Sequence, residues 1–119
     1  MRLWILCFCF VAIATVLSGQ TPATRPAAPA GNAQNGKKLF ANVGCYQCHG
    51  FEGQGGVGPR LAPRPIAFAT FSKYLRQPTG EMPPYTAKVV SDKDLTDIYS
   101  FLQSIPEPPS PESIPILKR

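Results

Sequence analysis

Residues 44–50 read GCYQCHG, with two cysteines three positions apart and a histidine directly after the second. That histidine, His49, is the only one in a chain of 119 residues that has four cysteines. The other two cysteines, Cys7 and Cys9, lie in an apolar run near the start of the chain. Chemistry at this stretch must therefore use two thiols and a single imidazole.

The first residues of the chain predict export. Arg2 precedes an apolar run over residues 3–17, which the small residues Ser18 and Gly19 end. A basic start, an apolar run of about 15 residues and a small-residue exit are typical of a secretory signal peptide. We predict a signal peptide over residues 1–19, cleaved after Ser18 or Gly19, and a periplasmic or exported protein. The alternative is an uncleaved membrane anchor, although the run is shorter than the ~20 residues that a span needs.

Composition divides the rest of the chain into a tether, one domain and a tail. Residues 20–34 are rich in proline and alanine, which predicts a disordered tether. Residues 106–119 form a proline-rich tail, whose prolines we expect to prevent any helix or central strand. The domain between them, residues 35–105, is too small to bury a generous core without a disulfide, metal or cofactor.

Three short helices are expected in this domain. Helical spacing of apolar residues marks residues 35–43 and 68–77. A capping signal opens a third helix over residues 91–105, which a proline ends. Residues 52–65 and 79–86 are glycine- and proline-rich loops, and long loops in a small domain usually have a function such as wrapping a ligand. The fold class is therefore all-α.

Charge constrains the partners. The net charge is +5, and losing Arg2 with a signal peptide leaves 11 basic against 7 acidic residues, or +4. The basic residues are scattered rather than clustered, so we expect no nucleic-acid binding. A mildly basic surface suits a protein partner with an acidic docking face.

Four kinds of site could use the cysteine pair. Zinc needs about four ligands, and the mature chain offers Cys45, Cys48 and His49. A thioredoxin-like pair would belong to a βαβ pattern, and no strand pattern precedes it. A disulfide is possible but would close a tiny loop and stabilise little. Cys-x-x-Cys-His is the attachment signature of c-type haem, with the histidine as proximal iron ligand. We therefore predict one haem c, attached through both cysteines.

The opposite face of the iron needs a second ligand. After the loss of Met1, Met82 is the only methionine. Pro83 and Pro84 follow it and make the backbone extended and stiff. A lone methionine is more often core filler, but this loop position favours its sulfur as an axial ligand. A lysine such as Lys88, or an open position, is the alternative.

Further patterns occur in order along the chain: Gly36 and Phe40 on the first helix, CYQCHG at residues 45–50, Gly58-Pro59, LRQPTGEMPPY at residues 75–85 and DLTDIYSFLQSIP at residues 94–106. Together they resemble class I cytochromes c, in particular small bacterial ones with a single haem. The resemblance covers roughly residues 35–105. It implies a small cytochrome c fold, in which three or more short helices and long loops wrap around one covalently bound haem. It also implies that the first and last helices cross at Gly36, with Phe40 against Phe101 or Ile98.

The resemblance implies further haem contacts. The Pro59 carbonyl would accept a hydrogen bond from the second ring nitrogen of His49, which would fix the tautomer of that ligand. Candidate contacts to the haem propionates are Arg60, Tyr74 and Tyr85.

Two classes of function are compatible with these features. A haem with histidine and methionine ligands binds no substrate, which favours a one-electron carrier between redox proteins, without a small-molecule substrate. The proline-rich tails are compatible with association with a membrane complex, or with a role as the cytochrome subunit of a dehydrogenase or oxidase. The alternative is a sensor or enzyme that binds a gas or peroxide at a labile sixth position, although a peroxidase usually needs a distal acid-base group. Hydrolase chemistry is not expected, because the one histidine is committed to iron.

Overall fold

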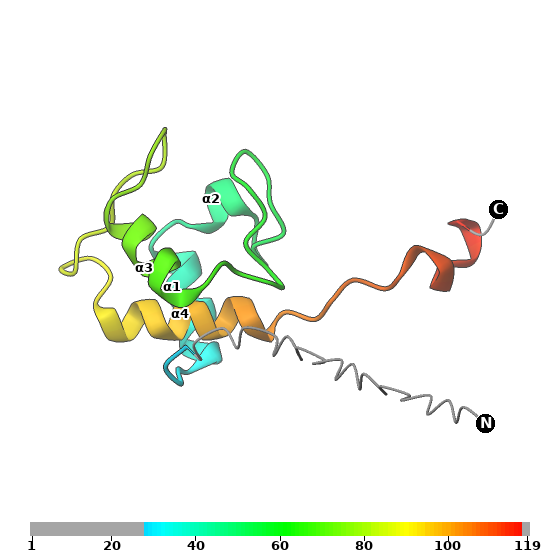
Figure 1. Ribbon diagram of the computed structural model, residues 1–119, viewed down its shortest axis with the longest axis horizontal. Coiled ribbons are helices and arrows are strands. Elements are labelled where there is room, and N and C mark those ends of the chain that lie inside the picture. Colours follow the sequence, from blue (N-terminus) through cyan, green and yellow to red (C-terminus); the bar gives the residue numbers. More distant parts are fainter. Residues whose placement is uncertain (1–27, 118–119) are drawn as a thin grey trace, which may run out of the picture.

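A computed structural model describes residues 28–117 (Figure 1). The predicted signal peptide and residues 20–27 of the predicted tether lie outside the described residues. The described part contains no strand, and its helical elements are α1 (Ala33–Asn42), α2 (Tyr46–His49), α3 (Phe68–Arg76), α4 (Asp92–Ser104) and two 3₁₀ turns, η1 (Pro111–Ser113) and η2 (Pro115–Leu117). The all-α prediction is confirmed.

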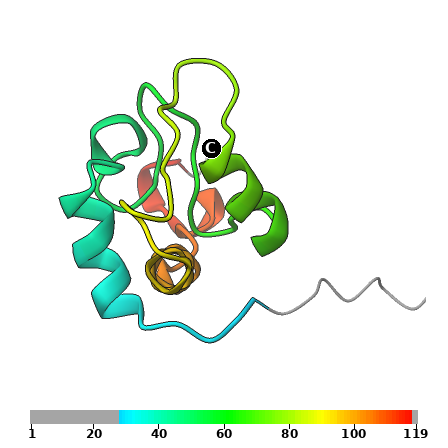
Figure 2. The same cartoon turned by 90° about the vertical axis from the view of Figure 1, so that its left-hand side faces the viewer.

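The core lies where α1 crosses α4, as a view along α4 shows (Figure 2). Phe40 and Phe101 are both buried, with ring centroids 5.6 Å apart. Gly36 is the contact point: a Cβ there would overlap the carbonyl oxygen of Asp97. The crossing expected from the resemblance, with glycine at the closest approach, is therefore present.

α1 begins at Ala33, earlier than the helix start at residue 35 expected from the sequence. The side chain of Asn32 accepts a hydrogen bond from the Asn35 amide (2.9 Å) and caps the helix. The Asn32 amide in turn donates to the carboxylate of Asp97 on α4 (2.8 Å). Packing against α4 and an N-cap thus extend the helix into a stretch whose composition suggested a tether.

α4 begins as the sequence predicts. Ser91 accepts a hydrogen bond from the Asp94 amide (3.1 Å), and Asp94 accepts one from the Ser91 amide (3.2 Å). This is a reciprocal capping box in which aspartate takes the place usually held by glutamate. Tyr99 also lies in the core, and its hydroxyl donates to the Ile66 carbonyl (2.9 Å).

α3 begins at Phe68 as predicted and ends at Arg76, just short of the predicted end at residue 77. α2, in the stretch that carries the cysteines, was not among the three expected helices. The tail leads away from the end of α4 (Figure 1), with its two turns at the far end. The expectation of no helix in the tail was too strict, because a proline at the first position of a 3₁₀ turn needs no amide donor. No helix within residues 28–117 has the length and apolar character to cross a membrane.

Candidate haem site

Cys45 is the N-cap of α2 and Cys48 lies within that helix. Cys45 is buried at its N-terminus, whereas Cys48 is exposed, and both are free thiols. Burial raises the pKa of the Cys45 thiol, and a hydrogen bond with Tyr85 only partly opposes that rise. A neutral thiol is a poor metal ligand and a poor nucleophile for disulfide exchange. Among residues 28–117 no group of three or more histidine, cysteine or acidic side chains is placed to hold a metal ion.

His49 is the last residue of α2 and is buried. Its Nδ1 lies 2.8 Å from the Pro59 carbonyl oxygen. Since a carbonyl can only accept, Nδ1 carries a proton and donates it, and in the neutral ring this leaves Nε2 as the nitrogen with a free lone pair. The hydrogen bond implied by the resemblance is therefore present, and it prepares the tautomer that a metal ligand needs.

The loop after α2 holds Pro59 in place by wrapping back over the helix end. The Gly55 amide donates to the His49 carbonyl (2.8 Å), and the Gly58 amide donates to the Cys48 carbonyl (2.8 Å). A Cβ on Gly58 would lie 2.7 Å from Cε1 of His49. The loop therefore packs on the imidazole through bare backbone, closer than any side chain allows.

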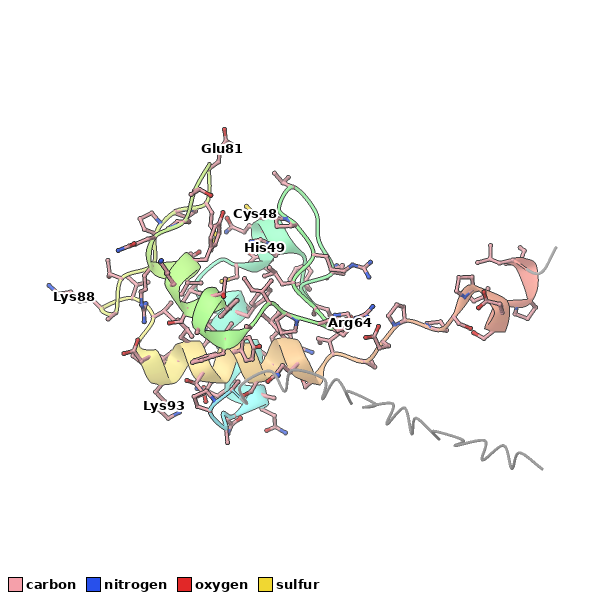
Figure 3. All side chains as sticks on the ribbon, in the orientation of Figure 1. Cys48, His49, Arg64, Glu81, Lys88 and Lys93 are labelled. Carbon is pink, nitrogen blue, oxygen red and sulfur yellow. The ribbon has the colours of Figure 1, made fainter. Side chains whose placement is uncertain are left out.

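Met82 lies in the long loop between α3 and α4 and is half-buried against the core. Glu81, its neighbour, lies at the loop tip, at the same end of the molecule as Cys48 and His49 (Figure 3). The fold thus brings the loop that carries the thioether to the end of the domain where the cysteine pair and the imidazole lie.

The other candidate residues lie on the surrounding loops and α3. The half-buried Tyr85 donates its hydroxyl proton to the Val43 carbonyl (3.0 Å), beside Cys45. The hydroxyl of Tyr74 donates to the Thr79 carbonyl (2.9 Å), and Nε of Arg60 donates to the Gln54 carbonyl (3.3 Å). The structure therefore brings Tyr85 to the cysteine and Pro59 to the histidine. The hydrogen bonds of Arg60 and Tyr74 stay within their own segments.

Arg76 is a feature that sequence reasoning missed. Its guanidinium binds carbonyl groups of the Met82 loop, Tyr85 among them, and the carboxylate of Asp92. The available signal was weak, because a basic residue in the last turn of a helix commonly interacts with nearby carbonyls wherever it occurs.

The donor set fits a covalently attached haem. It comprises two free thiols, at the N-cap of α2 and within it, an imidazole whose Nε2 would be available to iron, and a half-buried thioether next to Glu81 on the loop. The glycines of the loop after α2 keep backbone, rather than side chains, against the imidazole. Neither zinc nor a redox dithiol would require this combination.

Comparison with known proteins agrees with this assignment. The chain is 35% identical over 74 residues to the cytochrome c subunit of 4-cresol dehydrogenase [hydroxylating] from Pseudomonas putida. The matched part is 62% of this chain and 63% of that relative, so the chain spans less than two thirds of the relative's length. No solved structure matches the chain significantly. Residues 31–102 match the family described as cytochrome C oxidase, cbb3-type, subunit III. The chain belongs to this family, and the expectation of a small c-type cytochrome is confirmed.

Proposed function

We propose that this cytochrome carries one haem c, bonded through Cys45 and Cys48 and ligated by His49 and Met82, and shuttles single electrons between redox proteins. Electron transfer on a haem follows from the family. What we propose beyond the family is that the haem is single, that both cysteines attach it and that His49 and Met82 are its two ligands. The bound haem would supply a one-electron ferric–ferrous couple.

The observation that carries the proposal is the hydrogen bond from His49 to Pro59. It holds the proton on Nδ1, orients the ring and makes Nε2 more basic, as partners of metal-bound histidines generally do. Gly58 lets the loop approach closely enough for that bond. The chain therefore holds an imidazole ready to bind iron, beside two thiols at the spacing that thioether attachment requires.

Met82 completes the proposed ligand set. A thioether ligand raises the reduction potential of a haem relative to a second imidazole. Pro83 and Pro84 restrict the backbone that follows it, which reduces the freedom lost when the sulfur is fixed. A filled sixth position leaves no place for a gas or peroxide, which separates a carrier from a sensor or enzyme.

We also propose where the protein works and with what. The predicted signal peptide supports a periplasmic location, where c-type haem would be attached after export. The match to a dehydrogenase cytochrome subunit supports a redox enzyme as partner, and the net positive charge supports an acidic docking face on it.

Carbon monoxide tests the proposed ligation. Reduced holoprotein should bind the gas slowly, because Met82 occupies the sixth position. Met82→Ala should keep the covalent haem, bind the gas at once and have a lower reduction potential. Glu81→Ala, at the neighbouring loop position, is the control and should behave as the wild type. Rapid stoichiometric binding by the wild type would instead support the sensor or enzyme.

A further inference from the structure

The Met82 loop leaves α3 at Arg76 and enters α4 at Asp92. Two points on it, Tyr85 and Val90, lie beside the end of α3, and the turn over residues 86–89 separates them. Lys88 lies at an outer bend between them (Figure 3). A loop of this length without regular structure needs contacts elsewhere in the fold to keep one shape.

The guanidinium of Arg76 supplies three of these contacts. Nη1 donates to the carbonyl oxygens of Tyr85 (2.9 Å) and Val90 (2.7 Å). Nη2 donates to the Asp92 carboxylate at 2.7 Å. One side chain thus joins the end of α3, the middle and end of the loop, and the first residue of α4.

The two carbonyl contacts matter more than the ion pair. The Arg76 side chain is 22% exposed, whereas that of Asp92 is 91% exposed, so water screens much of the attraction between them. Hydrogen bonds from a charged donor to partly buried carbonyls are stronger, and losing the donor leaves those carbonyls without this partner. The planar fork of arginine reaches several acceptors at once, whereas the lysine ammonium is a point charge on a flexible stem.

The contacts that fix Tyr85 also restrict the position of Met82, which is close to it in sequence. The Tyr85 amide donates to the Leu75 carbonyl (3.0 Å), and its hydroxyl donates to the Val43 carbonyl (3.0 Å). With Arg76 on its own carbonyl, Tyr85 is held at three points. Only Pro83 and Pro84 separate it from Met82, and a proline pair has little backbone freedom. Fixing Tyr85 therefore restricts where the sulfur of Met82 lies.

We propose that Arg76 is a positioning residue for the sixth iron ligand, acting through the Tyr85 and Val90 carbonyls to hold the Met82 loop closed. The inference rests on the proposed ligation by Met82. It assigns the residence of the thioether on the iron to a residue whose hydrogen bonds go to the loop backbone and to Asp92.

The test uses carbon monoxide association with reduced holoprotein, together with the midpoint potential. Arg76→Gln should bind the gas about 10-fold faster than wild type, the size expected from losing one or two charged hydrogen bonds, and its potential should be lower. Asp92→Asn removes only the exposed ion pair and should resemble the wild type. Arg64→Gln, which removes another arginine from an exposed ion pair with Glu107, is the matched control.

A conservative variant separates position from charge. Arg76→Lys keeps the charge but cannot hold both carbonyls in the same way. It should bind carbon monoxide at a rate between those of the wild type and Arg76→Gln, and it provides the measurement if Arg76→Gln gives too little holoprotein. A rate equal to wild type would overturn the proposal, because charge would then suffice.

Two further variants, Asp97→Asn and Met82→Ala, separate the role of Arg76 from overall stability and from ligation by Met82. Asp97→Asn should lower overall stability at a site away from the loop while leaving the rate of carbon monoxide binding unchanged. A rise in that rate equal to the rise in Arg76→Gln would mean that any loss of stability opens the site, and it would overturn the proposal.

Met82→Ala gives the rate of carbon monoxide binding to an open site. If wild type already binds as fast as Met82→Ala, ligation by Met82 is wrong. If wild type is slow and Met82→Ala is fast but Arg76→Gln matches wild type, only the role of Arg76 is wrong.

Discussion

At the scale of single residues, the imidazole of His49 depends on a neighbour that has no side chain. Gly58→Ala would place a methyl group 2.7 Å from Cε1 of His49, so the ring or the loop must move. We expect the His49–Pro59 hydrogen bond to lengthen, the free energy of unfolding to fall by about 1–3 kcal/mol, and the reduction potential to rise as the imidazole becomes a weaker donor. Redox titration and chemical denaturation of the holoprotein measure both effects.

Val57→Ala provides the comparison, because Val57 adjoins Gly58 in the same loop and is 94% exposed. Val57→Ala should change neither the free energy of unfolding nor the reduction potential measurably. A Gly58→Ala protein with the potential and stability of wild type would show that the loop can shift without disturbing the ligand.

Asp97 is the charged residue most deeply placed in the described part, 2% exposed on α4. Hydrogen bonds from Lys93, then from the Asn32 amide and the Asn35 side chain, lower its pKa from 3.8 to about 2. A carboxylate with a lowered folded-state pKa contributes stability above its unfolded pKa and loses it as the pH falls through the folded value. This contribution should therefore be complete above about pH 4 and disappear toward pH 2.

Asp97→Asn should remove that pH dependence, on the order of 2 kcal/mol between pH 5 and pH 2. Asn35→Ala, which removes one of the three donors, should reduce the slope without abolishing it. Denaturant unfolding at a series of pH values measures both. If the free energy of unfolding changed with pH equally in the wild type, Asp97→Asn and Asn35→Ala, the hydrogen bonds to Asp97 would contribute nothing to stability in acid.

Single residues also mark the limit of what sequence reasoning reached. The cysteine pair, the histidine and the hydrogen bond to Pro59 could be predicted, because a short motif and one family resemblance specify them. Arg76 and Asp97 could not, because each acts through backbone groups that only tertiary packing brings within reach. An arginine near the end of a helix and an aspartate among polar helix residues look like ordinary solvated residues in a sequence.

At the scale of elements, the crossing of α1 and α4 depends on the missing Cβ of Gly36. Gly36→Ala would force the helices apart at the Asp97 carbonyl, which is backbone and cannot rotate away. We expect Gly36→Ala to lower the free energy of unfolding by about 3 kcal/mol, at the upper end for overpacked cores, although alanine has a better helix propensity than glycine. Thermal unfolding of the holoprotein provides the measurement.

Lys37→Ala, on the exposed face of the same helix, is the control and should be neutral or slightly stabilising. Equal melting temperatures for Gly36→Ala and wild type would mean that the two helices can separate at little cost.

Helix existence was more predictable than helix ends. The apolar periodicity located α1, α3 and α4, and the Ser91 cap located the start of α4. The start of α1 was missed because its cap, Asn32, is completed by a contact with α4 rather than by local sequence. Likewise, α2 is one turn that contains the cysteine motif, and periodicity cannot identify so short a helix.

At the scale of the whole molecule, the basic residues are spread over the surface rather than clustered in one patch. Lys88, Lys93 and Arg64 lie on different sides of the domain (Figure 3). Steering of an acidic partner would therefore come from the net charge, which is +5 for the whole chain and would be +4, 11 basic minus 7 acidic residues, if the predicted signal peptide were removed. The rate of electron exchange should fall by a few-fold, roughly, between low and physiological salt.

Stopped-flow electron exchange with an acidic redox protein measures this dependence, and an uncharged small-molecule reductant is the control, whose rate salt should leave unchanged. A protein-partner rate insensitive to salt would count against an acidic docking face.

The pairing of α1 with α4 also sets an order of events. The Asn32 amide and Asp97 are joined across 65 residues of sequence, so the core closes only after nearly all of the domain has been synthesised. Closing so long a loop costs on the order of 3–4 kcal/mol in chain entropy, which delays folding further. During that interval Cys45 and Cys48 remain in an unfolded, accessible chain. The same topology that later buries Cys45 thus leaves an interval in which both thiols are accessible, which the proposed attachment of haem would require.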